Sequence, residues 1–124
     1  NSTISNNSSS SSNGGIVVAS TTATSLIVDS TISGNSQEGI GNVGSLQIVG
    51  SAIVNNTGAG ITNYNLNNSV LTVTNSTISG NGAGGIFTVH ELTVRNSTIA
   101  VRQYAPIGCS KPQPRGFGSA YVPQ

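Results

Sequence analysis

The chain has 124 residues, of which 64 are Gly, Asn, Ser or Thr, while charged residues make up 6% and aromatic residues 4%. The net charge of +1 gives no electrostatic attraction to nucleic acid or to an anionic membrane surface, and no apolar stretch reaches the roughly 18 residues of a membrane span. The length allows one domain, and the single cysteine, Cys109, excludes an internal disulfide framework and a multi-cysteine metal site.

A repeat unit organises the chain, and each unit begins with the phrase Asn-Ser-Thr-Ile or a relative of it. These phrases start at Asn1, Asp29, Gly50, Asn75 and Asn96. Short β-prone segments alternate apolar and small polar residues, and Gly, Asn and Ser separate them. The chain therefore divides into four full repeats and the start of a fifth, which ends near Ala100.

The first segment of each repeat places one isoleucine inward. These isoleucines are Ile4, Ile32, Ile53, Ile78 and Ile99, and we expect them to stack as one internal ladder. An asparagine follows three residues after each of the first four: Asn7, Asn35, Asn56 and Asn81. We expect these asparagines to form a second ladder at a corner, because Asn tolerates the left-handed conformation and stacked amides can hydrogen-bond along the axis. Their predicted role is structural.

The second and third segments supply further internal ladders. The second segment contributes Ile16, Ile40, Ile61 and Ile86. The third contributes two aliphatic positions, predicted as Leu26-Leu46-Leu71-Leu92 and Val28-Ile48-Val73-Val94.

A unit of roughly 21–25 residues with three short strands cannot bury its apolar side alone. Stacking the units along an axis buries that side, because each strand then pairs in parallel with its counterpart one repeat later, about 4.8 Å away. The handedness of parallel crossovers makes the stack right-handed. The sequence predicts an all-β fold, a right-handed parallel β-helix of about four coils over residues 1–100. Open strand edges at Asn1 and near Ala100 further predict association through the coil ends.

Insertions relative to the repeat fall at residues 8–12, 19–24 and 64–68. We expect them to bulge outward as loops, which are the usual position of binding residues on a rigid scaffold. Tyr64, with Asn65 and Asn67 beside it, is the aromatic residue on such a loop. These three residues form the candidate binding loop.

Residues 101–124 form a second segment, which contains all four prolines and carries a net charge of +3, against −2 for residues 1–100. Proline cannot donate to a β ladder, so this segment is not another coil. We expect a loosely ordered tail or a cap, and a linker or foreign sequence at a truncated end remain alternatives.

The aligned repeats resemble those of bacterial polymorphic outer membrane proteins. The steps Gly14-Gly15-Ile16 and Gly84-Gly85-Ile86 look like the Gly-Gly-aliphatic step of that family, and Ile78-x-x-Asn81 looks like its aromatic-x-x-Asn step, with Ile in place of Phe. More broadly, the chain is similar to pectate-lyase-like right-handed β-helix repeat proteins of bacteria. The resemblance implies a secreted or cell-surface protein, extracellular or in the outer membrane, in a group whose members include polysaccharide-active and adhesive proteins.

The acidic residues are too few and too scattered for the chemistry of polysaccharide lyases and hydrolases. Asp29, Glu38 and Glu91 occupy different places in the repeat, so no two of them stack as a catalytic pair or converge on a calcium ion. His90 and Glu91 with Arg95 form the one titratable cluster, interpreted as solvated surface groups. We therefore expect no catalytic, cofactor-binding or metal-binding residue.

The outward positions of the first segment offer a different activity. They include Thr3, Thr31, Ala52, Thr77 and Thr98, flanked by Ser5, Ser33, Val54 and Ser79. A flat Thr-x-Ser array resembles the ice-binding surface of some solenoid antifreeze proteins, although Ala52 and Val54 interrupt it.

The leading hypothesis is a non-catalytic structural or adhesive segment of a bacterial secreted or cell-surface protein. Its expected partner is carbohydrate or a host or neighbouring cell surface. The alternative is a fragment of a carbohydrate-active β-helix enzyme whose catalytic coils lie elsewhere, and ice binding is a minor alternative.

Overall fold

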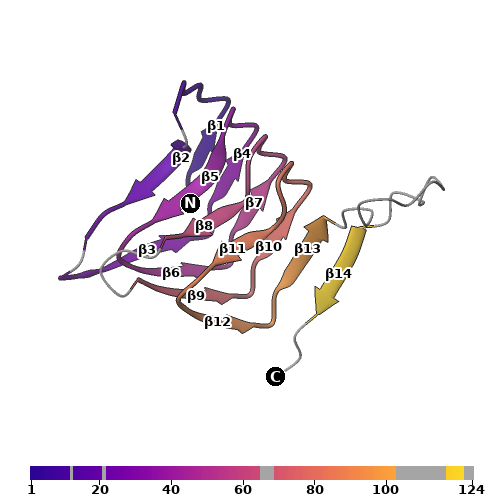
Figure 1. Cartoon of the computed structure of the whole chain (residues 1–124). Helices are drawn as coiled ribbons and strands as arrows, with labels where there is room; N and C mark the ends of the chain where they lie inside the picture. The colour runs from indigo at the N-terminus through magenta and orange to yellow at the C-terminus, as the bar shows by residue number, and fades with distance from the viewer. Residues whose placement is uncertain (12, 21, 65–68, 103–116, 122–124) are drawn as a thin grey trace.

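The computed structural model describes residues 1–11, 13–20, 22–64, 69–102 and 117–121 (Figure 1). For residues 101, 102 and 117–121 it describes the backbone strands and not the side chains. Three sheets wind around a common axis as a solenoid of about four coils, so the predicted all-β parallel β-helix is confirmed. Within the described residues, no helix is long and apolar enough to cross a membrane.

Each coil contributes one short strand to each sheet. The first sheet contains β1 (Thr3–Ser5), β4 (Thr31–Ser33), β7 (Ala52–Val54), β10 (Thr77–Ser79), β13 (Thr98–Arg102) and β14 (Phe117–Tyr121). The second sheet contains β2 (Asn13–Val18), β5 (Glu38–Asn42), β8 (Ile61–Asn63) and β11 (Ile86–Thr88). The third sheet contains β3 (Thr24–Val28), β6 (Ser45–Val49), β9 (Val70–Thr74) and β12 (Glu91–Arg95).

Aliphatic side chains in register fill the interior. In the first sheet Ile4, Ile32, Ile53, Ile78 and Ile99 are successive partners across parallel strands. The middle three are fully buried, whereas Ile4 and Ile99 at the two ends are partly buried against the core. Each fully buried isoleucine stabilises the fold by about 1.5–3 kcal/mol relative to an exposed one. The same ladders serve every coil, so a few aliphatic residues per repeat suffice.

The predicted ladder of the third sheet is wrong in the first coil. The residue opposite Leu46 is Ser25, and the residue opposite Ile48 is Ile27. Leu26 and Val28 therefore point outward, with exposed fractions of 61% and 37%. In the other three coils the predicted partners do pair, as Leu46-Leu71-Leu92 and Ile48-Val73-Val94.

The corner that follows the third strand explains this register. Asp29, Gly50, Asn75 and Asn96 all have positive φ and begin the next repeat. The inward residue lies two positions before this corner in every coil, and in the first coil that residue is Ile27. A one-residue shift moves a strand's side chains to the opposite face of the sheet. Aligning Leu26 with Leu46 therefore assigns the outward side chains of β3 to the core and its inward side chains to the surface.

The left-handed residue at the corner after the first strand also differs from the prediction. It is the residue before each ladder asparagine: Asn6, Gly34, Asn55 and Gly80 have φ between 57° and 67°. Asn6 and Asn55 are exposed, whereas Asn35, Asn56 and Asn81 are buried. In this turn one residue adopts the left-handed conformation, and the asparagine after it contributes its side-chain amide to the ladder. At Gly80 a Cβ would meet Oδ1 of Asn55 from the previous coil, so Asn and Gly alternate along this edge.

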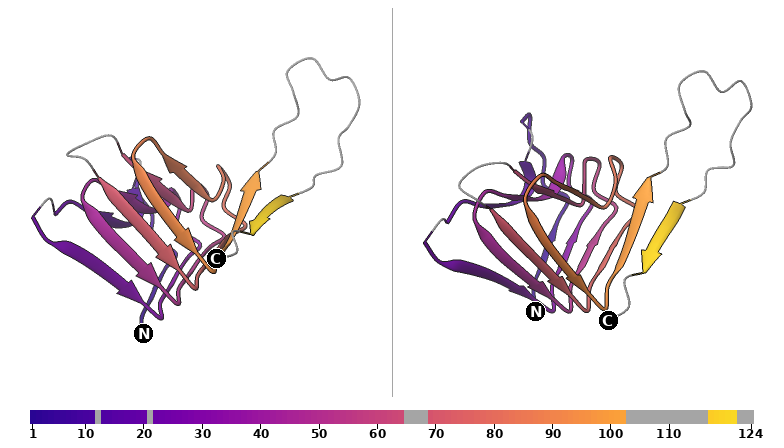
Figure 2. Two further views of the ribbon diagram at one scale, coloured as in Figure 1. Left: turned by 90° about the horizontal axis from the view of Figure 1, so that it is seen from below. Right: turned by 60° about the horizontal axis from the view of Figure 1, so that its bottom comes forward.

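The last two described strands cross from the predicted repeats into the predicted tail. β13 extends to Arg102, two residues beyond the predicted end of the repeats, and β14 pairs with it antiparallel (Figure 2). All other pairings between described strands are parallel. β14 therefore covers the edge of the first sheet near Ala100. Residues 103–116 and 122–124 lie outside the described residues.

Candidate functional site

An asparagine ladder lines the corner between the first and second sheets. Nδ2 of Asn7 donates to Oδ1 of Asn35 at 3.0 Å, Asn35 donates to Asn56 at 2.8 Å, and Asn56 donates to Asn81 at 3.0 Å. Each acceptor oxygen also receives the backbone N–H of the preceding ladder residue at 3.0 Å. These amides satisfy backbone groups at a corner where the sheet pairing stops, and Asn35, Asn56 and Asn81 are buried there.

A second polar ladder, absent from the sequence prediction, lines the corner between the second and third sheets. Nδ2 of Asn42 donates to Oδ1 of Asn63 at 2.7 Å, and Nδ2 of Asn63 donates to Oγ1 of Thr88 at 3.0 Å. Asn42 and Asn63 are fully buried. A sequence signal for this ladder exists, because each asparagine lies two residues after a second-strand isoleucine.

A serine ladder lines the third corner. The backbone N–H of Ser30 donates to Oγ of Ser51, and the same 3.1 Å bond links Ser51 to Ser76 and Ser76 to Ser97. Each serine hydroxyl donates in turn to the carbonyl two residues before it, at 2.7–2.9 Å. In the three later copies of the repeat phrase this serine, Ser51, Ser76 or Ser97, is thus a buried structural residue, a role that the repeat pattern alone does not predict.

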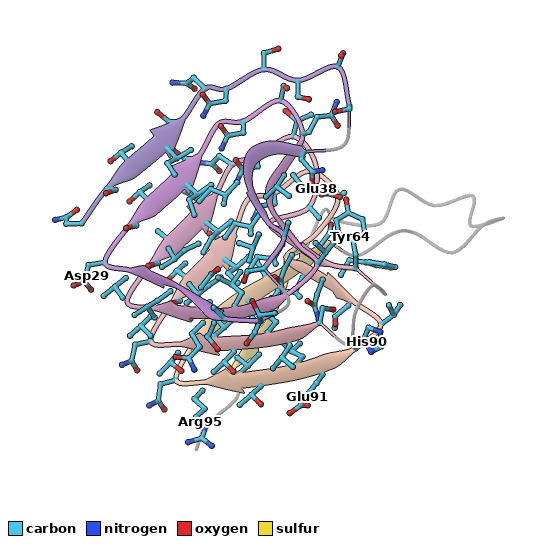
Figure 3. All side chains as sticks on the ribbon, turned by 90° about the vertical axis from the view of Figure 1, so that its left-hand side faces the viewer. Asp29, Glu38, Tyr64, His90, Glu91 and Arg95 are labelled. Carbon is cyan, nitrogen blue, oxygen red and sulfur yellow. The ribbon has the colours of Figure 1, made fainter. Side chains whose placement is uncertain are left out.

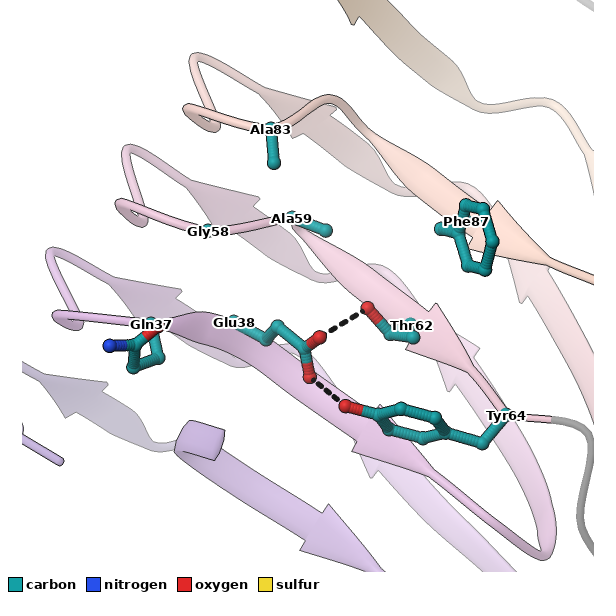
Figure 4. Close-up of a pocket in the computed structure, with 8 residues that line it drawn as sticks. All are labelled: Gln37, Glu38, Gly58, Ala59, Thr62, Tyr64, Ala83 and Phe87. Atoms are coloured by element: carbon teal, nitrogen blue, oxygen red, sulfur yellow. Dashed lines mark hydrogen bonds between the residues drawn. The ribbon is translucent and has the colours of Figure 1, made fainter. Parts of the chain in front are cut away.

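A shallow groove on the outer face of the second sheet is the candidate functional site. It has a volume of about 430 Å³ and runs across β5, β8 and β11 (Figure 4). Its walls are lined by Gln37, Glu38, Gly58, Ala59, Thr62, Tyr64, Ala83 and Phe87. A mostly apolar lining with a few convergent polar groups is the usual composition of small-molecule sites.

Glu38 supplies the charge of the groove. Its carboxylate accepts a hydrogen bond from Oγ1 of Thr62 at 2.7 Å through one oxygen and from the Tyr64 hydroxyl at 2.7 Å through the other (Figure 4). Thr62 lies on the neighbouring strand β8, and Tyr64 follows the end of the same strand. The two hydroxyl groups fix the position of the carboxylate on the wall of the solenoid.

Tyr64 lies at the start of the predicted binding loop, and its ring covers a glycine. A Cβ at Gly41 would meet Oδ1 of Asn13 and would lie 3.3 Å from Cε2 of Tyr64. The hydroxyl of Ser69 donates to the Tyr64 carbonyl at 2.6 Å, which ties the two ends of the loop together. Asn65 and Asn67, the other residues of the predicted loop, lie outside the described residues.

Phe87 forms the other side of the groove. It is 61% exposed and pairs across the sheet with Thr62, which pairs with Gly41 under the Tyr64 ring. The two aromatic rings therefore stand on either side of Thr62 in one row. The sequence does not predict that Glu38 and Phe87 line the same groove as Tyr64, because the three residues lie in different repeats.

The comparisons with known proteins agree with this architecture. The sequence model described as "Right handed beta helix region" matches residues 1–100. The chain belongs to the right-handed β-helix family. The comparisons with curated proteins and with solved structures found no match.

The titratable residues of this β-helix do not assemble into a cluster. His90 lies just before β12, Glu91 begins the strand and Arg95 ends it, so four residues of extended chain, about 13 Å, separate Glu91 from Arg95 (Figure 3). Asp29 lies at the corner after β3, away from Glu38. Among the described residues, no group of three or more His, Cys, Asp or Glu side chains could hold a metal ion.

Proposed function

We propose that residues 1–100 form a non-catalytic scaffold of a secreted or cell-surface bacterial protein, and that the groove on the second sheet binds carbohydrate. The observation that carries the proposal is the row formed by Tyr64, Thr62 and Phe87, with the carboxylate of Glu38 beside it. The similarity of the repeats to those of bacterial surface proteins supports the extracellular location. A rigid wall that holds an exposed groove also suits an adhesive segment.

The chemistry of the groove matches that of a sugar. A sugar ring presents hydroxyl groups at its rim and apolar C–H groups on its faces. The exposed ring of Phe87 offers an apolar surface, and Glu38 and Thr62 offer hydrogen-bonding groups within the same groove. This combination favours a carbohydrate over a purely apolar ligand.

The position of Glu38 favours binding over cleavage. Glycosidic hydrolysis commonly uses two carboxyl groups about 5–10 Å apart, one on each side of the bond. Glu38 is the one carboxylate among the groove's lining residues, and hydroxyl groups hold both of its oxygens. The alternative, a fragment of a carbohydrate-active enzyme whose catalytic coils lie elsewhere, needs a second catalytic group from outside this groove.

The binding proposal is tested by titrating the protein with oligosaccharides and recording amide NMR shifts. We expect shifts confined to β5, β8 and β11, and we expect Phe87→Ala to weaken binding about tenfold, since an aromatic contact contributes up to about 1.5 kcal/mol. Leu26→Ala is the matched control, because Leu26 is also 61% exposed but lies on the third sheet. Equal losses in the two variants, or no shifts at all, would contradict the proposal.

The same preparation tests the enzyme alternative. Incubation with acidic and neutral polysaccharides should leave the substrates intact, with no new reducing ends and no unsaturated products. Turnover that survives purification to homogeneity would replace the non-catalytic proposal with the enzyme one.

Ice binding is a second candidate because the outward threonines of the first sheet stand in register. Thr3 pairs with Thr31 and Thr77 pairs with Thr98, while Ala52 occupies the same row between them. A measurement of thermal hysteresis decides the matter. A freezing point equal to the melting point removes this candidate.

A further inference from the structure

Glu38 is the charged residue among those that line the groove. Its negative charge favours sugars that carry a positive charge over neutral and acidic ones. We propose that the groove selects sugars bearing a protonated amine, such as glucosamine oligomers, over neutral and acidic sugars of the same length. The inference rests on the proposed carbohydrate site and names the class of sugar bound there.

The carboxylate of Glu38 keeps part of its hydrogen-bonding capacity. A carboxylate offers about four acceptor positions, and the hydroxyl groups of Thr62 and Tyr64 occupy one on each oxygen. Both donors are neutral, so they orient the carboxylate without neutralising it. An ammonium group placed at the groove would gain charge-assisted hydrogen bonds to the remaining positions.

None of the residues that line the groove carries a basic side chain. The lining residues other than Glu38 are Gln37, Gly58, Ala59, Thr62, Tyr64, Ala83 and Phe87, all neutral. Arg95, which lies at the end of β12, stands on the far side of the coil from Glu38 (Figure 3). An anionic sugar such as a uronate would therefore meet a carboxylate without a cation beside it.

The aromatic rings strengthen the same preference. A cation attracts the face of a phenyl or phenol ring within about 6 Å of its centre, with about 0.5–1 kcal/mol at exposed sites. Phe87 is exposed at the groove, and the Tyr64 ring lies over Gly41 with its hydroxyl bonded to Glu38. A protonated amino sugar adds a charge-assisted hydrogen bond and a cation–ring attraction, whereas a neutral sugar makes only neutral-donor hydrogen bonds to the carboxylate and apolar contacts with the rings.

The test compares matched oligosaccharides by isothermal titration at a pH where the amine is protonated. We expect glucosamine oligomers to bind about fivefold more tightly than N-acetylglucosamine oligomers of the same length, and oligogalacturonates to bind most weakly. Raising the salt concentration should reduce the preference. Equal binding of the amine and acetylated oligomers would overturn this inference and leave the carbohydrate site standing. Binding of none of the three would overturn both proposals.

Two variants locate the effect on the groove. Glu38→Gln is nearly isosteric and retains a carbonyl oxygen, so it should abolish the preference for the amine while leaving the acetylated oligomer's affinity within about twofold. Glu91→Gln removes the same charge from an exposed position on β12 and should leave the preference unchanged. A preference that survives in Glu38→Gln, or that falls equally in both variants, contradicts the assignment to Glu38.

Lysine amide is the probe for an amine without a sugar, and its binding as tightly as the glucosamine oligomer would overturn selection of a sugar.

Discussion

The side-chain amide of Asn56 uses all of its hydrogen-bonding positions. Its oxygen accepts the backbone N–H and the side-chain Nδ2–H of Asn35, and its nitrogen donates to Oδ1 of Asn81 and to the carbonyl of Ile32. A carboxamide has two donors and two acceptor lone pairs, so this residue is fully satisfied although it is 2% exposed. One side chain thus links three successive coils.

Replacing this amide should cost a large part of the stability of the fold. We expect Asn56→Ala to lower the free energy of unfolding by about 3 kcal/mol, because buried donors on Asn35 lose their acceptor and each unsatisfied buried group costs about 1–3 kcal/mol. Urea denaturation followed by circular dichroism measures the change. Gln47→Ala, which removes an exposed amide from β6, is the control and should change the stability by less than about 0.5 kcal/mol. Similar effects of the two substitutions would show that the ladder adds little.

The asparagine ladder, the serine ladder and the groove differ in how far the sequence could predict them. The asparagines at 7, 35, 56 and 81 recur at a fixed distance from an isoleucine, so their stacking followed from the spacing. The serine of the repeat phrase recurs just as regularly, yet serine is common on solvated strands, so composition alone gives it no buried role. The bond between Glu38 and Tyr64 joins residues 26 positions apart and depends on an insertion, so no local pattern predicts it.

At the scale of single elements, strand register depends on the corners more than on the most hydrophobic residues. β3 contains three consecutive aliphatic residues, Leu26, Ile27 and Val28, and an alternating pattern can be placed on it in two ways. The positive φ at Asp29 fixes the choice, because the corner must align with Gly50 in the next coil. The sequence could therefore predict the strand, but which of its side chains face inward depends on where the turn falls.

This register makes a prediction about two neighbouring residues. We expect Ile27→Ala to destabilise the protein by about 1–2 kcal/mol, because Ile27 packs partly buried against the core. Leu26→Ala should have an effect below about 0.5 kcal/mol, because Leu26 is mostly exposed. The midpoints of chemical denaturation of both variants provide the comparison. The opposite order of effects would restore the register predicted from the sequence, with Leu26 inside.

At the scale of the whole molecule, the three sheets differ in whether a further described strand covers their edge at the last coil. β14 pairs with β13 at the edge of the first sheet, whereas β11 and β12 are the last described strands of the second and third sheets. Unpaired strand edges favour association with other chains. The antiparallel strand therefore protects the sheet that would otherwise present Thr98–Arg102.

Removing this strand should expose the edge. We expect a chain truncated after Arg102 to self-associate, with a weight-average mass that rises with concentration in sedimentation equilibrium, relative to the full chain. Adding Val101→Pro to the truncated chain should reverse the effect. Thr98 donates its N–H to Ser76 of the previous coil, so by the alternation of a strand the N–H of Val101 faces the opposite edge, where β14 pairs, and proline removes that edge donor. A truncated chain with the same mass distribution as the full chain would argue against a protective role of β14.

The hydrogen bonds of the asparagine ladder all point the same way. In each step from Asn7 to Asn81 the nitrogen of the earlier coil donates to the oxygen of the later one, and the serine corner repeats this sense. The asparagine and serine ladders therefore have a direction along the solenoid axis. Each ladder has an acceptor group at its N-terminal end and a donor group at its C-terminal end. A second molecule could continue these ladders only with its N-terminal coil against the C-terminal coil of the first, or the reverse. A fibre built in this way would be polar and open-ended, unlike a closed symmetric dimer.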